Sequence, residues 1–340
     1  MKRFVPLVNQ GGCMKKMGSL FCLVTLFAMV LAMPAIAGPA AEGPEPVMES
    51  RLALATGGTS GTYYPIGAAI ANVVSKNTKG IQVTAESTAG SVANLRMIEE
   101  KKVDLILSAS NTASGAFLGE DPFKAPIKNM QGMMALYPET FQFVVLKSSG
   151  MKTLADLKGK KVAVGAAGSG TERTTKLLLE ALGISYTDVK VQFLSFGEGV
   201  TALKDRIIDC AVVGAGTPTA AVVDASASLD IHLLDVEEAA YLKVNKDSPF
   251  IIRSRIPAGT YKGVDIDVNT VASPALLIVR DDLQSDVVYE IISSIFANLA
   301  TIQASHAQGK NISLETALDG MSIPLHPGAY RFFKEKGMAK

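Results

Sequence analysis

The chain has 340 residues, of which 48% are hydrophobic and 19% charged, with 33 basic against 32 acidic side chains. This balance argues against nucleic acid as a partner, because nucleic-acid-binding proteins concentrate excess basic charge on one face. Only three cysteines are present, and just one of them, Cys210, lies outside the N-terminal leader described next, which excludes an internal disulfide in the processed chain.

Residues 1–37 have the pattern of a secretory signal peptide. Lys15 and Lys16 precede an apolar stretch from Leu20 to Leu31, and the small-residue pattern A-x-A ends at Ala37. The apolar stretch is shorter than the about 20 residues that a membrane-spanning helix needs. We therefore predict cleavage after Ala37 and a periplasmic location, with an uncleaved N-terminal anchor as the alternative.

The predicted processed chain is nearly neutral and long enough for two lobes. Residues 1–37 contain four basic and no acidic residues, so 29 basic and 32 acidic side chains remain. Residues 38–50 are rich in proline and glycine and are predicted to form a flexible leader. The about 290 residues that follow exceed the usual size of one hydrophobic core and favour two lobes. Cys210 lies in the apolar run IIDCAVVG and is predicted to be a buried hydrophobic residue.

One structural unit occurs twice along the chain. The segment ALATGGTSGTYYPIG from Ala53 aligns with VAVGAAGSGTERTTK from Val162, and the segments that begin at Ile81 and Val189 also correspond. Each copy predicts the order strand, loop, helix, strand, loop, helix, strand. Such alternation is typical of a parallel sheet with right-handed crossovers and helices on both faces. Two matched α/β lobes fit the length better than one large parallel sheet of repeated units.

The glycine-rich loops of the repeat predict a site for a small anion. In open α/β sheets the ligand lies beyond the carboxyl ends of the strands, where these loops occur. Glycine permits close backbone approach, hydroxyl groups donate hydrogen bonds, and the following helix presents unpaired N–H groups. Neither loop matches G-x-G-x-x-G or contains G-K-[ST], so we expect no nucleotide and no other cofactor.

An enzymatic role has little support in the sequence. His232, His306 and His326 are scattered and lack neighbours at metal-ligand spacing, so no metal is expected. The nucleophile motif G-x-S-x-G is absent from both loops. Asp104 and Asp209 correspond in the two copies, but each precedes an apolar strand. Each is expected to end a turn, away from the ligand-binding cleft expected between the two lobes. We therefore predict a binding protein and not an enzyme.

The predicted binding residues come from the loops and from the helix starts beside them. Arg173, in the first turn after the second loop, either pairs with a ligand carboxylate or stays solvated. Ser87, Thr88 and Ser91 either face the cleft or only cap a helix. The complete predicted ligand-binding set is Thr59, Ser60, Thr62, Tyr63, Ser87, Thr88, Ser91, Tyr137, Ser169, Gly170, Thr171, Arg173, Gly216 and Pro218.

Several motifs in order resemble the TAXI family of solute-binding proteins, the receptors of one branch of TRAP transporters. They are TGGTSGTYYPIG, STAGSVANLRMI, LYPET, DLKGKKVAVGAAGSGTE and HPGAYRFFKEKG, and they span almost all of the predicted processed chain. The resemblance implies a two-lobed type II periplasmic-binding fold with a hinge and an interlobe cleft. It also implies a TRAP permease as partner and an organic acid or amino acid, glutamate- or dicarboxylate-like, as ligand. In one departure, Ser108-Ala109-Ser110-Asn111 stands where the family commonly has an acidic residue.

Chain order predicts where the lobes meet. We expect lobe 1 to comprise residues 51–137 and 273–340, and lobe 2 to comprise residues 138–272. Two crossings between the lobes would form a hinge and permit closure on a ligand. The sequence thus predicts a monomeric extracytoplasmic solute receptor. The alternatives are a ligand-binding input for a signalling receptor and, less favoured, an exported enzyme.

Overall fold

The repeated unit predicted from the sequence folds as expected in the computed structural model, which describes residues 50–339. The predicted signal peptide and residues 38–49 of the leader lie outside the described residues. The first copy consists of β1 (Ser50–Ala55), α1 (Tyr63–Asn77), β2 (Ile81–Glu86), α2 (Ser91–Glu99) and β3 (Leu105–Ala109), followed by α3 (Ser110–Leu118). The second consists of β5 (Lys161–Ala163), α4 (Gly170–Ala181), β6 (Lys190–Gln192), α5 (Phe196–Lys204) and β7 (Cys210–Ala215), followed by α6 (Ala220–Ser228).

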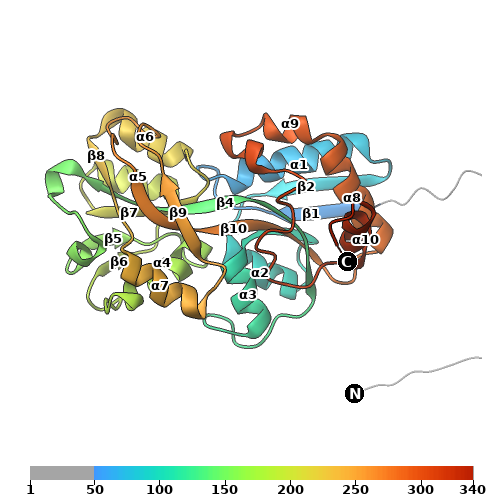
Figure 1. Cartoon of the computed structure of the whole chain (residues 1–340), viewed down its shortest axis with the longest axis horizontal. Helices are drawn as coiled ribbons and strands as arrows, with labels where there is room; N and C mark the ends of the chain where they lie inside the picture. The colour runs from blue at the N-terminus through green and yellow to red at the C-terminus, as the bar shows by residue number, and fades with distance from the viewer. Residues whose placement is uncertain (1–49, 340) are drawn as a thin grey trace, which may run out of the picture. The chain divides into compact units, whose positions relative to one another are not determined.

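The two copies form matching parallel arrangements. β1 lies between β2 and β3, and β5 lies between β6 and β7, with every pair parallel. We name the half that contains β1–β3 lobe 1 and the half that contains β5–β7 lobe 2. Figure 1 shows the two halves, with lobe 1 on the right and lobe 2 on the left.

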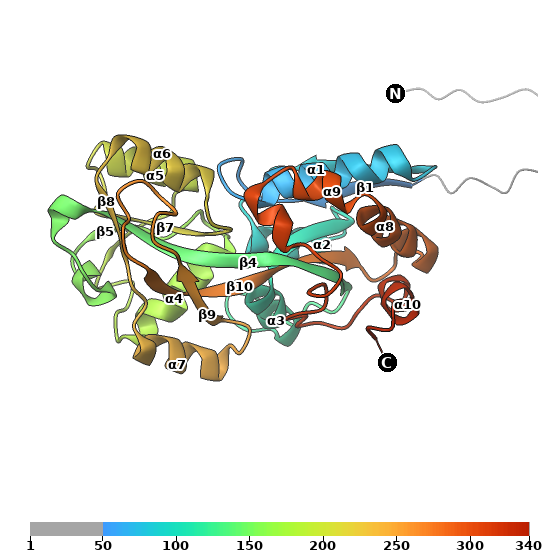
Figure 2. The ribbon, with the colours of Figure 1, turned by 45° about the horizontal axis from the view of Figure 1, so that its top comes forward.

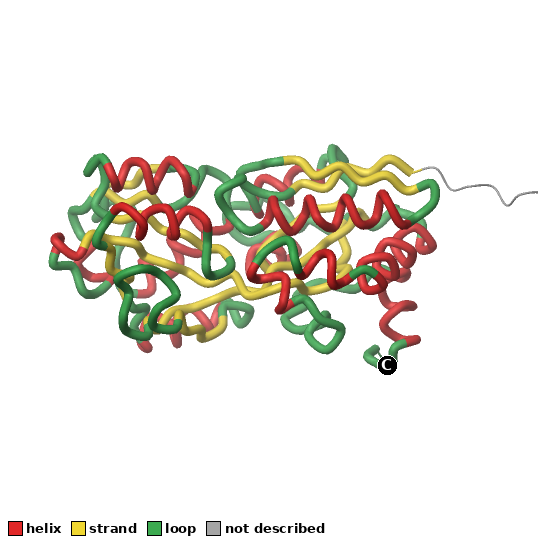
Figure 3. Tube along the Cα trace, turned by 90° about the horizontal axis from the view of Figure 1, so that it is seen from above, coloured by secondary structure: helices red, strands yellow, loops and turns green. Residues whose placement is uncertain are grey.

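Two long strands, β4 (Met130–Leu146) and β10 (Val268–Arg280), join the lobes. They pair with each other in antiparallel fashion, with Pro138 opposite Pro274, while β10 also pairs with β3 and β4 with β7. The resulting strand order is β2-β1-β3-β10-β4-β7-β5-β6. The joining strands therefore add antiparallel pairs to the predicted parallel sheets, because one strand leaves lobe 1 and the other returns to it. In Figure 3 strands pass through the middle of the molecule from one half to the other.

The remaining elements complete the two lobes. Helices near the C-terminus share a hydrophobic core with α1, since Val288 and Ile292 pack in the same cluster as Ile66 and Ile70. No helix between residues 50 and 339 is long and apolar enough to cross a bilayer. The remaining elements of both lobes are η1 (Lys147–Ser149), η2 (Leu154–Leu157), β8 (Ile231–Leu234), α7 (Glu238–Asp247), β9 (Ile252–Ile256), α8 (Ser285–Ala297), α9 (Leu299–Gln303), η3 (Ala307–Asn311) and α10 (Pro327–Glu335).

Helices cover both faces of the sheet in each lobe (Figure 2). Side chains that alternate along a strand enter different cores: in β3, Leu105 and Leu107 pack towards α1 and α8, whereas Ile106 packs towards α2 and α3. In β7, Cys210 belongs to the core that contains α4 and α7, and Ala211 to the core under α5 and α6. Cys210 is fully buried, as predicted, and burial raises the pKa of its thiol well above the usual value.

Candidate ligand-binding site

A cavity of about 400 Å³ lies between the lobes. Its volume falls in the range of roughly 300–1,000 Å³ that is common for small-molecule sites. Four loops, each leading into a helix, supply most of its wall, and the crossing strand β4 supplies Glu139 and Phe141. The residues that line it are Gly57, Gly58, Thr59, Ser60, Gly61, Thr62, Tyr63, Ser87, Thr88, Ala89, Gly90, Ser91, Ala109, Glu139, Phe141, Ala166, Ser169, Gly170, Thr171, Ser195, Phe196, Gly197, Glu198, Gly214 and Ala215.

The N-termini of four helices converge on this cavity. The N-cap residues are Thr62 of α1, Gly90 of α2, Ser169 of α4 and Ser195 of α5, and all four line the cavity. The first N–H groups of a helix lack partners within it, and together with the helix dipole they attract anions. The cavity therefore presents the positive ends of these four helices, two from each lobe, and Ala109, the N-cap of α3 in lobe 1, lines it as well.

The caps differ between the two lobes. In lobe 2, the Ser169 hydroxyl accepts a hydrogen bond from the Glu172 N–H at 3.0 Å, and the Ser195 hydroxyl accepts one from the Glu198 N–H at 3.4 Å. In lobe 1, neither cap makes a side-chain hydrogen bond of this kind. Gly90 has φ +108°, a conformation that side-chain-bearing residues rarely adopt.

The loops of the two lobes meet in a crossed arrangement. The first loop of lobe 1 faces the start of α5, because a Cβ at Gly197 would lie 2.9 Å from the Ser60 hydroxyl. The second loop of lobe 1 faces the start of α4, because a Cβ at Gly170 would lie 2.7 Å from the Ser91 hydroxyl. The N–H of Ala93 also donates to the carbonyl of Gly168 at 2.9 Å. Each S-G-T loop thus packs against the second loop of the other lobe, and not against its own counterpart.

Ten of the fourteen residues predicted to bind ligand line the cavity, and four do not. Several of the ten also make structural hydrogen bonds: the Ser87 hydroxyl donates to the carbonyl of Gly57, and the Thr88 hydroxyl contacts Asn94 at 2.6 Å. The ten are Thr59, Ser60, Thr62, Tyr63, Ser87, Thr88, Ser91, Ser169, Gly170 and Thr171. The four are Tyr137, Arg173, Gly216 and Pro218.

Arg173 is neither solvated nor part of the cavity wall. Its side chain is 6% exposed and reaches from α4 into lobe 1. There Nε donates to the Asp121 carbonyl at 3.0 Å, Nη1 to the Asn111 carbonyl at 3.2 Å, and Nη2 to the Glu120 carboxylate at 2.9 Å. Every nitrogen of the guanidinium is therefore engaged by lobe 1. The helix turn that carries Arg173 aims this side chain at α3, away from the loop hydroxyls.

The other three residues outside the cavity wall also have structural surroundings. Tyr137 is buried in the core of lobe 1, where its hydroxyl has no hydrogen-bond partner among the described residues. The Gly216 carbonyl accepts hydrogen bonds from the hydroxyls of Thr62 at 3.4 Å and Thr219 at 2.7 Å. It thereby links the first loop of lobe 1 to lobe 2. Pro218 follows Thr217, whose carbonyl accepts a hydrogen bond from Gln308.

The sequence prediction omitted several residues that line the cavity. One omitted segment, from Ser195 to Glu198 at the start of α5, forms part of the cavity wall. The repeat contained a signal for it, because Ser195 aligns with Ser87, which was in the predicted set. Glu139 was also omitted, although it lies in the LYPET segment that carries the TAXI resemblance.

Glu139 is a buried acid in the cavity wall. Its side chain is 7% exposed, and desolvation raises the pKa of its carboxyl group to about 8. The nearby Tyr63 hydroxyl opposes this shift in part. The Tyr63 hydroxyl also lies 3.3 Å from the Ser91 hydroxyl, which accepts a hydrogen bond from the Ala109 N–H at 3.0 Å. A chain of polar groups thus runs from Glu139 to the start of α2.

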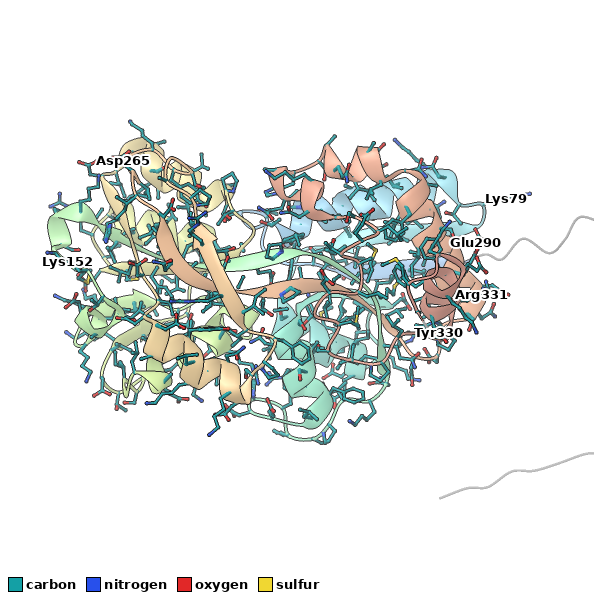
Figure 4. All side chains as sticks on the ribbon, in the orientation of Figure 1. Lys79, Lys152, Asp265, Glu290, Tyr330 and Arg331 are labelled. Atoms are coloured by element: carbon teal, nitrogen blue, oxygen red, sulfur yellow. The ribbon has the colours of Figure 1, made fainter. Side chains whose placement is uncertain are left out.

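No cationic side chain belongs to the described wall of the cavity. Its ionisable side chains are Glu139, Glu198 and Tyr63. Hydrogen bonds from Ser195 lower the pKa of the Glu198 carboxyl group. Lys79 and Lys152 project from opposite outer ends of the lobes in Figure 4. The helix N-termini are therefore the groups in this wall that favour an anion. Within residues 50–339, no group of three or more His, Cys, Asp and Glu side chains is arranged to hold a metal ion.

The equivalent aspartates of the repeat lie outside this wall. Asp104 accepts a hydrogen bond from the Ala53 N–H at 2.8 Å, and Asp209 accepts one from the Lys161 N–H at 2.8 Å. Each carboxylate thus braces the first strand of its own lobe, and neither lines the cavity.

The model of the NMT1-like family matches residues 54–337, which include the four loops and both crossing strands. The chain belongs to the NMT1-like family. It is similar in structure to the periplasmic binding protein BugD, with 12% sequence identity over 85% of this chain and 94% of that chain and a TM-score of 0.52. It is also similar to a periplasmic transporter, with 12% identity over 85% of this chain and 93% of that chain and a TM-score of 0.50.

A third similar structure is that of PhnD1 from Prochlorococcus marinus (MIT 9301) in complex with methylphosphonate. It is 14% identical over 84% of this chain and 97% of that chain, with a TM-score of 0.49. At these identities the likenesses to BugD and to the periplasmic transporter concern the fold. The two-lobed α/β fold of periplasmic binding proteins, predicted from the sequence, is confirmed for this member of the NMT1-like family.

Proposed function

We propose that this protein is an exported receptor that closes on a small anionic solute and presents it to a membrane transporter. The observation that carries the proposal is the convergence of four helix N-termini on one interlobe cavity whose described wall has no cationic side chain. Unpaired backbone N–H groups and hydroxyls bind a carboxylate or a similar group well. The NMT1-like family and the fold of periplasmic binding proteins support a role in binding and not in catalysis.

Contacts between the lobes support a closing mechanism. In addition to the hydrogen bonds of Arg173, the Asn111 side chain of α3 donates to the Thr174 hydroxyl of α4 at 2.9 Å. These contacts flank the cavity and describe a closed arrangement, which has to open before a ligand can enter. We place the hinge in β4 and β10, between lobes formed by residues 51–137 with 273–340 and by residues 138–272.

We further propose that the partner is a TRAP permease of the TAXI type and that the ligand is an organic acid or amino acid, glutamate- or dicarboxylate-like. The support is that motifs which carry the TAXI resemblance supply the site. TGGTSGTYYPIG and STAGSVANLRMI form the two loops of lobe 1, and LYPET carries Glu139. The protein would act as a monomer in the periplasm, since one chain contains both walls of the cavity.

Thermal-shift screening of the processed protein against a metabolite panel tests this function. The panel contains carboxylates, amino acids, sulfonates and phosphonates, and each hit is then measured by isothermal titration calorimetry. We expect at least one anionic compound to raise the melting temperature and to bind at one site per chain. If a folded preparation, freed of co-purified ligand by unfolding and refolding, binds no member of the panel, the proposed function is wrong.

A further inference from the structure

Glu139 is an acid in the cavity wall for which the described structure supplies no cation. The residue is 7% exposed and lines the cavity together with Tyr63. Among the described residues of the cavity wall, none is a lysine, arginine or histidine. The acid occupies β4 at the position opposite Ser273 of β10, where the two crossing strands meet. It therefore lies at the hinge as well as in the site.

An unpaired carboxylate at such a position is costly. Transfer of a charged group from water into a poorly solvated interior is unfavourable unless a partner compensates it. The nearby Tyr63 hydroxyl compensates the charge only in part. The remaining compensation has to come from a proton on Glu139 or from a cationic group that enters the cavity.

The helix N-termini indicate where in the cavity the anionic group of a ligand would bind. Gly90, Ser91, Ser169 and Gly170 place two helix starts, one from each lobe, against the polar chain that begins at Glu139. An anion bound there would repel an ionised Glu139. A ligand that places a cationic nitrogen at Glu139 and its anion at the helix starts satisfies both groups at once.

We propose that Glu139 binds a cationic nitrogen of the ligand and so selects carboxylates that bear an amine over their hydroxyl and oxo analogues. This inference rests on the proposed function and names the chemical class of its ligand. Tyr63 acts as a positioning residue, because its hydroxyl links Glu139 to Ser91.

Binding of such a ligand is coupled to loss of a proton. In the free protein near pH 7 the Glu139 carboxyl group is mostly protonated, because its pKa is about 8. When the cationic nitrogen binds, the O–H bond breaks, the proton passes to water, and the carboxylate pairs with the cation. The titratable groups that face Glu139 are Tyr63 from α1 and Tyr137 from β4, with Glu198 from α5 in the same cavity wall.

The direction in which affinity changes with pH distinguishes amine-bearing ligands from anions without an amine. An amine-bearing ligand needs the ionised acid, so its affinity rises by about tenfold per pH unit below pH 8 and levels off above that value. An anion without an amine favours the protonated acid, so its affinity falls as the pH rises above 8. Proton release on binding near pH 7 therefore indicates a cation at Glu139.

The test uses ligand pairs that differ only in amine against hydroxyl: alanine and lactate, serine and glycerate, aspartate and malate, glutamate and 2-hydroxyglutarate. Titration calorimetry at pH 7 in Bis-Tris and in Tris, neither of which has an anionic buffer species, gives the affinity and the number of protons released. We expect the amine member of at least one pair to bind at least about tenfold more tightly and to release about one proton. In Glu139→Gln the preference should fall below about threefold, and the proton release should disappear.

Two further variants make the result specific to Glu139. Glu335→Gln is the matched control, because Glu335 also accepts a hydrogen bond from a tyrosine, Tyr289, at 2.7 Å, but lies outside the cavity wall. It should retain the amine preference and the proton release. Tyr63→Phe removes a hydroxyl group that lowers the pKa of Glu139, so the pH at which affinity levels off should increase.

The remaining outcomes would contradict either the inference about Glu139 or the proposed receptor function. If a hydroxy acid, a sulfonate or another ligand without an amine binds as tightly as any amine-bearing compound, the inference about Glu139 is overturned while the receptor function stands. The same holds if Glu139→Gln retains both the preference and the proton release. If the wild-type protein binds neither the pairs nor the wider panel, the receptor function itself fails.

Discussion

The guanidinium of Arg173 in lobe 2 lies 2.9 Å from the carboxylate of Glu120 in lobe 1. Its other nitrogens hold two backbone carbonyls of lobe 1, those of Asn111 and Asp121. Because α4 also carries Thr171 of the cavity wall, this ion pair fastens to lobe 1 a lobe 2 helix that borders the site. We therefore infer that Arg173 acts on ligand binding through closure of the lobes, and not through contact with the ligand.

Arg173→Ala should shift the protein towards the open state. Hydrogen bonds to charged groups contribute about 1.5–3 kcal/mol each, and most of this contribution is absent when the lobes separate. Ligand affinity should fall by roughly 10-fold to 100-fold, mainly through faster dissociation. Stopped-flow binding and small-angle scattering with saturating ligand measure these effects.

The control for this variant is Lys176→Ala on the same helix. Lys176 also pairs with lobe 1, but it and its partner Asp121 are 39% and 80% exposed. An exposed ion pair contributes only about 0–1 kcal/mol, so affinity should change by less than about fivefold. Equal losses in the two variants would contradict the assignment of closure to Arg173.

Gly170→Val should abolish closure without unfolding the protein. The new Cβ would meet the Ser91 hydroxyl of the other lobe at 2.7 Å. The lobes would then remain apart, and affinity should fall by at least about 100-fold, as expected when several hydrogen bonds are lost together. Calorimetry gives the affinity, and circular dichroism tests folding.

Gly199→Ala in α5 serves as the control for Gly170→Val, because its Cβ would make an ordinary 3.5 Å contact with Ala163. This variant should bind ligand like the wild type. Unchanged affinity in Gly170→Val would show that the starts of α2 and α4 do not meet in the bound state.

The stability of the ligand-free protein should depend on the protonation of Glu139. The pKa of this group is about 8 in the folded protein and close to 4.5 in the unfolded chain, so the folded state holds its proton more strongly. Its contribution to stability is therefore complete below pH 4.5 and is lost as the pH rises to about 8. The resulting decrease in the free energy of unfolding is at most about 3–5 kcal/mol.

Urea unfolding of the wild type and of Glu139→Gln between pH 5 and 9 isolates this contribution. The difference in unfolding free energy between the two proteins should shift in favour of Glu139→Gln as the pH rises, and then level off above pH 8. A pH-independent difference would mean that Glu139 titrates normally in the folded protein.

Export should remove the first 37 residues. Expression of the full chain in a Gram-negative host should give a mature N-terminus at Gly38 and release of the protein by osmotic shock. N-terminal sequencing and cell fractionation measure both. Recovery in the membrane pellet with residues 1–37 attached would favour the uncleaved anchor.

The sequence by itself determined the features that rest on local chemistry. Glycine and hydroxyl residues before a helical pattern specify a loop and a capped helix start, so Ser60-Gly61-Thr62 and Ser169-Gly170-Thr171 could be placed at helix N-termini without a structure. The repeat then fixed the order of strands and helices in each lobe. The apolar run IIDCAVVG placed Cys210 in a core.

Only the tertiary structure decided which of these local features meet. Arg173 has the same position in its helix whether it faces ligand, solvent or lobe 1, and the packing of α4 against α3 selects lobe 1. The crossed contact of Gly170 with Ser91 depends on how the two crossing strands orient the lobes. Glu139 reads as an ordinary polar residue of an extended segment. Its burial and its raised pKa arise because β4 crosses between the lobes beside Tyr63 of α1, in the wall of the cavity.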